Sequence, residues 1–138
     1  SVIHVAGRDD SSSLLQISAL QQALYPGTGE VGIEEISVCR FDELFVSQDI
    51  KSRSILKIDT QGFELEVIKG AGDLIGKIGW VYCECSFQEL YAGQALAGEV
   101  VDVLGKKGFS VSGMYNPSYD NKGVCVQADI LCSSAYTG

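Results

Sequence analysis

The chain has 138 residues, a formal net charge of −8 and a hydrophobic content of 46%. This length fits one domain with a single core. The acidic balance argues against a nucleic-acid partner, because phosphate binding needs a basic stripe and the ten lysines and arginines are scattered. No apolar run approaches the roughly 20 residues that cross a bilayer, and no signal-peptide pattern is evident, so we expect a cytoplasmic protein without membrane contact.

The chain contains five cysteines, at positions Cys39, Cys83, Cys85, Cys125 and Cys132. Most of them lie in apolar runs, and we expect reduced thiols in the core of a cytosolic protein. Cys83 and Cys85 do not have the spacing of a zinc site, and His4 is the single histidine. The sequence therefore predicts no bound metal.

The first quarter of the chain predicts a strand, a helix and a loop. Val2–Ala6 has the composition of a strand, and the leucines and isoleucine from 14 to 24 have the spacing of one apolar helical face. Ser12 and Ser13 would belong to the cap of that helix, or would present hydroxyls to a ligand. The glycines of 27–32 match G-x-G-x-x-G, but a helix enters them and a strand leaves, so we expect a loop and not a nucleotide site.

Two short elements are predicted next. Residues 33–39 form a strand candidate, and Asp42 would cap a short helix over 42–45.

The stretch from Ser54 to Ala71 predicts a strand, a turn and a helix. An apolar run ends at an acid, Gly62 allows a turn, and Val67 and Ile68 continue at helical spacing. Ligands of open α/β sheets collect at the carboxyl ends of strands, where Asp59 would lie. Asp59 would equally suit a cap of the following helix, without any further function.

A second acid lies in the next apolar strand, 80–87. Burial of the Glu84 carboxylate is costly unless it is paired or accepts hydrogen bonds, so Glu84 would either face a ligand cleft or have a specific structural partner, and we expect the cleft. The following loop, 88–94, would overhang that cleft, or would tuck Tyr91 into the core.

The remaining elements are a helix ending near 105–108, a strand over 109–115, a turn over 116–123 and a last strand over 124–132. Parallel strands need crossovers, whereas a terminal hairpin needs only a turn. The pattern predicts an α/β fold with a mixed sheet and a carboxyl-terminal antiparallel hairpin.

The stretch Ile55–Ala71 resembles the signature of the FkbM-type methyltransferase family, in which a strand ends Lys-Ile-Asp-x-x-Gly-x-Glu. This central motif is specific. Individually weaker matches follow the family order: Ser11–Leu15, Phe41–Leu44, Cys83–Phe87, Leu90–Gln94 and Gln127–Leu131.

The resemblance implies a Rossmann-like class I methyltransferase fold and transfer of a methyl group from S-adenosylmethionine to a hydroxyl of a small molecule or sugar. It implies catalytic roles for Asp59, Glu84 and Glu64, with Asp59 nearest the methyl group. Glu64 would otherwise be a first-turn acid favoured by the helix dipole. We expect the cofactor to contact Asp59, Thr60 and Gln61.

We further expect the substrate to contact Ser12, Ser13 and Tyr91. Compared with the family, the amino-terminal half with its glycine-rich turn is missing, so residues 1–138 are expected to be one partial domain of a longer enzyme. The flank left open would suit a homodimer. The alternatives are a noncatalytic domain that binds a partner through this flank, and a hydrolase that uses Asp59 and Glu84.

Overall fold

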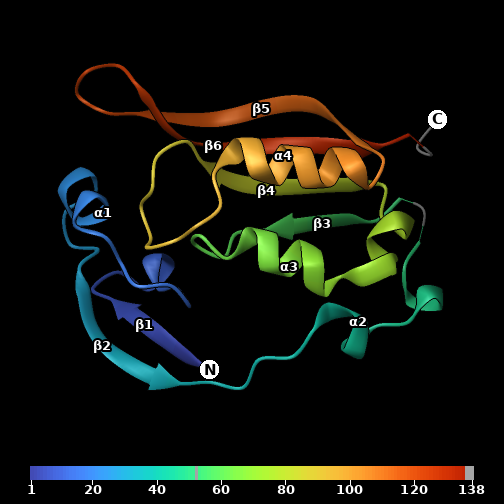
Figure 1. The fold of residues 1–138 in the computed structure, drawn as a ribbon, viewed down its shortest axis with the longest axis horizontal. Coiled ribbons are helices and arrows are strands. Elements are labelled where there is room, and N and C mark those ends of the chain that lie inside the picture. The colour runs from blue at the N-terminus through green and yellow to red at the C-terminus, as the bar shows by residue number, and fades with distance from the viewer. Residues whose placement is uncertain (52, 136–138) are drawn as a thin grey trace.

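The computed structural model describes residues 1–51 and 53–135. Within them the strands form a two-stranded antiparallel sheet and a four-stranded sheet (Figure 1). The strands are β1 Val2–Ala6, β2 Glu30–Glu35, β3 Ile55–Ile58, β4 Trp80–Ser86, β5 Phe109–Tyr119 and β6 Cys125–Ser134. The helices are α1 Ala19–Leu24, α2 Phe41–Leu44, α3 Glu64–Gly70 and α4 Ala97–Lys106, with 3₁₀ turns at Asp9–Ser11, Ser47–Asp49 and Gly72–Lys77.

The larger sheet is mixed and has the order β3-β4-β6-β5. Strands β3 and β4 are parallel, because α3 and the 3₁₀ turn after it return the chain to the starting edge. Strand β6 is antiparallel to both of its neighbours, β4 and β5. This arrangement confirms the predicted α/β class, the mixed sheet and the terminal hairpin.

The core lies between one face of this sheet and the two longest helices, α3 and α4, which lie side by side over it (Figure 1). Along β4 buried and partly exposed residues alternate, as the two-residue period of a strand requires. Cys83 therefore points into the core, while Tyr82 and Glu84 lie on the opposite face. All five cysteines are free, with Cys83, Cys85 and Cys132 buried and Cys39 exposed.

Long-range contacts overturn the prediction of a helix beginning after the serines. Ser13 and Ile17 form isolated β-bridges with His4 and Tyr91, so this part of the chain is extended. Helix α1 begins only at Ala19, and the side chain of Ser18 caps it by accepting from the Gln21 N–H group at 3.2 Å. The interpretation of the earlier serines as a helix cap is therefore wrong.

Several element boundaries also differ from the prediction. Strand β2 begins at Glu30, earlier than expected, because it pairs with β1. Helix α2 has Arg40 and not Asp42 at its N-cap, since the Asp42 carboxylate is paired with the Arg40 guanidinium at 2.6 Å. Strand β5 continues to Tyr119, so that the connecting turn is shorter than predicted.

Strand β3 forms an edge of the main sheet (Figure 1). On its outer side no strand of the described ranges pairs with it, and Ile55 is 61% exposed. An unpaired edge is a surface on which another strand can add. The homodimer through this flank stays a prediction. None of the helices in the described part of the chain has the length and apolarity required to cross a bilayer.

Candidate active site

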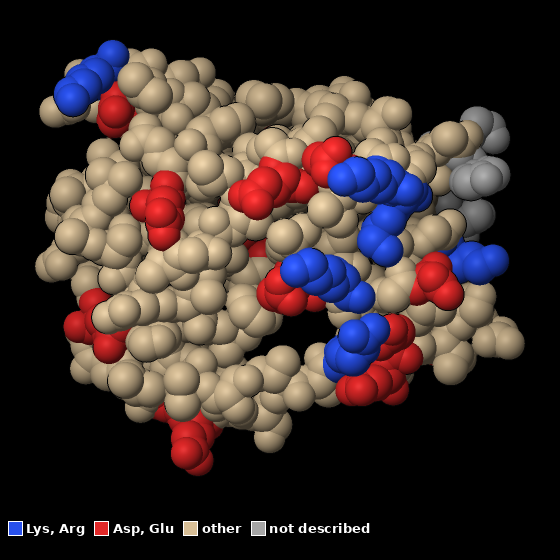
Figure 2. All heavy atoms as spheres, in the orientation of Figure 1, with Lys and Arg blue, Asp and Glu red and all other residues tan. Residues whose placement is uncertain are grey.

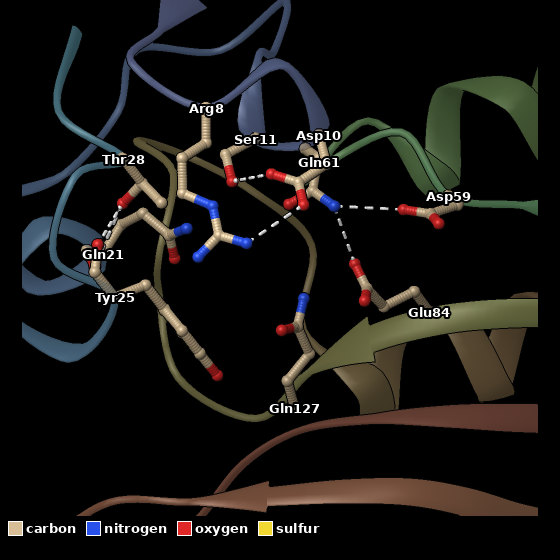
Figure 3. Close-up of a pocket in the computed structure, with 10 residues that line it drawn as sticks. All are labelled: Arg8, Asp10, Ser11, Gln21, Tyr25, Thr28, Asp59, Gln61, Glu84 and Gln127. Atoms are coloured by element: carbon tan, nitrogen blue, oxygen red, sulfur yellow. Dashed lines mark hydrogen bonds and ion pairs between the residues drawn. The ribbon is translucent and has the colours of Figure 1, made fainter.

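A cavity of about 230 Å³ lies between the ends of β3 and β4 and the segment 8–28 (Figure 3). Each of its lining residues carries a polar or charged group, and three of these groups are carboxylates. The lining residues are Arg8, Asp10, Ser11, Gln21, Tyr25, Thr28, Asp59, Gln61, Glu84 and Gln127. The predicted residues Asp59, Gln61 and Glu84 are thus brought together, as expected for the carboxyl ends of neighbouring parallel strands.

Asp59 follows the last residue of β3, Ile58, which is buried. Its Oδ2 atom is 2.6 Å from Lys57 Nζ, and its Oδ1 atom accepts a hydrogen bond from Gln61 Nε2 at 3.0 Å. The N-cap residue of α3 is Phe63, so Asp59 does not occupy the capping position. The side chain remains 39% exposed and borders the cavity.

Gln61 connects the two carboxylates of the site. Its Nε2 atom donates to Asp59 Oδ1 and to Glu84 Oε2, both at 3.0 Å (Figure 3). Its Oε1 atom accepts from the Tyr91 hydroxyl at 2.8 Å, and its backbone oxygen accepts from Ser13 Oγ at 2.6 Å. Gln61 has a φ of 52°, which is uncommon for a residue with a side chain. These bonds hold the amide in one orientation between the acids.

Glu84 lies on β4 beside Asp129 of β6, on the sheet face opposite to α3 and α4. Burial raises the pKa of Glu84 to about 7, and the nearby charges of Asp59 and Asp129 add to this effect. The hydrogen bond from Gln61 acts in the opposite direction. Glu84 therefore exchanges a proton in the neutral pH range, where a general acid or base is most effective.

This raised pKa predicts a pH-dependent stability difference for Glu84→Gln. The pKa of Glu84 in the unfolded chain is about 4.3. Between that pH and about pH 7, the folded protein therefore binds more protons than the unfolded chain. Protonated Glu84 adds to the free energy of unfolding. This contribution is fully present below about pH 4 and is lost as the pH rises through about 7. Because Gln stays neutral, the variant should match the parent at pH 4 and exceed its stability at pH 8 by about 1–2 kcal/mol, after discounting for partial exposure.

Urea unfolding at both pH values measures this difference. Glu34→Gln is the control, since Glu34 lies exposed on β2. It should change the free energy of unfolding by the same small amount at pH 4 and at pH 8. If the difference in free energy of unfolding between Glu84→Gln and the parent were the same at both pH values, the proton exchange assigned to Glu84 would be contradicted.

Glu64 lies behind the turn and shapes it. Its Oε1 atom accepts from the Gly62 N–H at 2.8 Å and from the Thr60 N–H and hydroxyl, each at 3.3 Å. The residue is 3% exposed, and burial raises its pKa, although these hydrogen bonds act in the opposite direction. Gly62, with a φ of +98°, supplies the left-handed conformation that the turn requires. Glu64 is therefore placed to position the segment that carries Asp59.

The predicted cofactor contact Thr60 lines a different cavity, of about 600 Å³, between α2 and α3. This second cavity has mostly apolar walls, and charged side chains that include Arg40 and Lys69 also line it. Figure 2 shows an opening flanked by basic and acidic side chains on this face of the molecule. The cofactor contact of Thr60 stays a prediction.

The side chains of the predicted substrate contacts, Ser12, Ser13 and Tyr91, form hydrogen bonds behind the lining residues of the cavity. Ser12 Oγ accepts from the Ala6 N–H at 3.1 Å. Ser13 is 1% exposed, and Tyr91 is fully buried with its hydroxyl donating to the Ser11 backbone oxygen as well as to Gln61. Burial is also the main cause that raises the pKa of Tyr91. Their direct contact with substrate stays a prediction.

The family model described as "Methyltransferase FkbM domain" matches residues 1–111 of the chain. The chain belongs to the FkbM methyltransferase family. It is also similar to the "2-O-methyltransferase NoeI" of Sinorhizobium fredii (strain NBRC 101917 / NGR234), with 34% identity over 65 residues. This match covers 47% of the chain and only 27% of the length of that relative. No solved structure matched the chain.

The sequence analysis did not predict the remaining lining residues of this FkbM-family cavity. Arg8, Gln21, Tyr25 and Thr28 come from a segment that was interpreted as a turn, a helix and a loop. Each reaches the cavity because the segment folds back onto the end of the main sheet, which no local pattern encodes. Gln127 lies within one of the family-like segments, and that was the available signal for it.

Proposed function

We propose that this chain takes part in methyl transfer from S-adenosylmethionine to a hydroxyl of a small molecule, as part of a longer enzyme. The observation that carries the proposal is the pair of carboxylates, Asp59 and Glu84, bridged by Gln61 in a cavity at the ends of parallel strands. We also propose a Rossmann-like class I fold. The order β3-β4-β6-β5 with β6 reversed supports it.

The residues present suit the reactive end of this cofactor. S-adenosylmethionine supplies a methyl group activated by a positively charged sulfur. The negative charges of Asp59 and Glu84 would stabilise this positive charge. Arg8 is the basic residue among the lining residues named above. The volume, about 230 Å³, lies below the roughly 300–1,000 Å³ of ligand pockets. The cavity therefore fits part of such a ligand.

The protein groups would position and deprotonate the acceptor hydroxyl. A hydroxyl in the cavity would donate a hydrogen bond to Asp59, whose carboxylate would accept its proton during the reaction. The bonds from Lys57 and Gln61 fix the orientation of Asp59. Glu84, which accepts from the same Gln61 Nε2 atom as Asp59 and exchanges a proton near neutral pH, would stabilise the positive charge of the cofactor in its ionised form.

Cofactor binding tests the proposal without a known acceptor. We expect isothermal titration to show tighter binding of S-adenosylmethionine than of S-adenosylhomocysteine, which lacks the positive charge, by about tenfold. Glu84→Gln should reduce this ratio at pH 8, because it removes one of the negative charges, and should reduce it much less at pH 5, where Glu84 of the parent is itself protonated. If neither compound bound detectably at millimolar concentration, the result would instead favour the noncatalytic alternative.

A further inference from the structure

Strand β5 forms the edge of the main sheet opposite to β3 (Figure 1). Within the described ranges no strand pairs with its outer side, so backbone N–H and C=O groups are open there. Such an edge accepts a further strand unless charges, prolines or bulges obstruct the pairing. Strand β5 therefore needs either protection or a partner.

The side chains of β5 are all uncharged. Phe109–Tyr119 contains no lysine, arginine, aspartate or glutamate, whereas 20% of the whole chain is charged. Figure 2 shows the upper edge of the molecule, to the right of the hairpin tip, without basic or acidic side chains. Val111 and Met114 are 51% and 54% exposed. A long edge strand of this composition favours pairing with another chain.

Regular pairing along β5 ends after residue 115. Pro117 has no N–H group, and Asn116 has a φ of 49°, which is uncommon for a residue with a side chain. The register against β6 shifts between Tyr115 and Ser118 as well. The segment that can accept a further strand is therefore 109–115, which we call the open edge.

A bulge at Ser112 determines which side chains of the open edge share a face. Val111 lies opposite Cys132 of β6, and Met114 lies opposite Ile130. Cys132 and Ile130 are both buried in the core beneath the helices. Val111 and Met114 therefore lie on the face that α4 covers, although residues three apart in a regular strand lie on opposite faces.

This arrangement makes the open edge self-complementary. Ser110 and Tyr115 lie on the other face, opposite partly exposed residues of β6. Residues that oppose each other in antiparallel strands share a face. A second copy, turned about a two-fold axis between residues 112 and 113, would place Val111 opposite Met114 and Ser110 opposite Tyr115. Each pair joins side chains of one face and occurs twice.

Strands β2 and β3 suit a second copy less well. Strand β2 carries Glu30, Glu34 and Glu35, which would approach the same charges of another copy. Strand β3 has four residues, one of which is the charged Lys57. Because each chain has a net charge of −8, two copies repel each other least where their contact is neutral. Strand β5 provides such a contact.

We propose that the open edge pairs with the open edge of a second copy, so that the main sheet continues across a two-fold axis. Val111 and Met114 form the apolar contact on the α4 face. Each chain has one such edge, so the contact closes with two chains. The open edge is shorter than the roughly 20–30 residues per side of a standard interface, so we expect a micromolar dimer. The dimer does not depend on the proposed methyl transfer.

Sedimentation equilibrium over a concentration series tests this interface. The parent should reach about twice the 14.8 kDa mass of one chain. Val111→Lys/Met114→Lys should associate at least about tenfold more weakly, because each lysine faces another lysine across the axis. Val111→Glu/Met114→Glu should do the same. An equimolar mixture of the two variants should dimerise again, since each lysine then faces a glutamate.

Val31→Lys/Ile33→Lys is the matched control. It adds the same charge at two exposed side chains of another edge strand, β2. It should dimerise like the parent. Ile55→Lys alters the edge of β3 and should also dimerise, which separates this interface from the flank expected from the sequence.

A parent with the mass of one chain up to about 1 mM would overturn the interface. So would undiminished association of the lysine variant, or a mixture that associates no better than its components. Loss of the dimer in Ile55→Lys alone would place the contact at the β3 edge instead. Masses above two chains would overturn the two-fold axis.

Discussion

Asp59→Asn is expected to lower the turnover of the proposed methyl-transfer reaction by a factor of about 10²–10⁴, the usual contribution of a positioned general base. The amide keeps the size of the side chain but cannot accept a proton. The bond from Lys57 Nζ and the bond from Gln61 Nε2 both end on the carboxylate oxygens, so the variant also loses charge assistance at 2.6 and 3.0 Å. The measurement is the initial rate of S-adenosylhomocysteine formation at saturating cofactor and acceptor.

Asp102→Asn is the matched control for this substitution. Asp102 lies on α4 and is also paired with a lysine, Lys106, at 2.6 Å. The chemical change is identical, but Asp102 is not a lining residue of the cavity, so turnover should be unchanged. Equal rates for Asp59→Asn and the parent chain would show that Asp59 has no role in the proposed reaction.

Glu64→Ala is expected to destabilise the fold by about 3 kcal/mol, because the buried Gly62 donor and the partly buried Thr60 donors lose their shared acceptor. For a domain of this size the melting temperature should fall by about 10 °C. Glu64→Gln keeps an acceptor oxygen and should cost only about 1 kcal/mol. Thermal unfolding followed by circular dichroism measures both values.

Glu66→Ala provides the control on the same helix. Glu66 is exposed and pairs with Lys69 at 2.6 Å, three residues along α3. Such surface pairs contribute little, so its loss should change stability by less than about 0.5 kcal/mol. If the two alanine variants were equally stable, the turn would not depend on the Glu64 hydrogen bonds.

The central part of the fold could be predicted because its signals are contiguous. The strand, the acid, Gly62 and the helical spacing lie within one stretch, and the structure contains β3, the turn and α3 in this order. The terminal hairpin is equally local. The proximity of Asp59 and Glu84 could be predicted from a general rule, that the carboxyl ends of parallel strands meet at one edge.

The contribution of the amino-terminal segment could not be predicted, because distant partners determine it. Ser13 and Ile17 have apolar neighbours at helical spacing, yet bridges to His4 and Tyr91 keep them extended. The delayed start of α1 then places Gln21 at the cavity. Helical periodicity indicates a buried face, but it does not show which polar side chain of that helix enters a site.

The bridging role of Gln61 has a consequence for the order of folding. Its backbone and side chain are bonded to Ser13 and Tyr91, which lie 48 and 30 residues away in sequence. Contacts between distant residues form slowly, whereas the β5–β6 hairpin is local and can form early. The orientation of Asp59 and Glu84 is therefore completed late, after three separate segments have docked. Ligand affinity would then report the final step of folding, and a partly folded chain with most of its secondary structure would bind nothing.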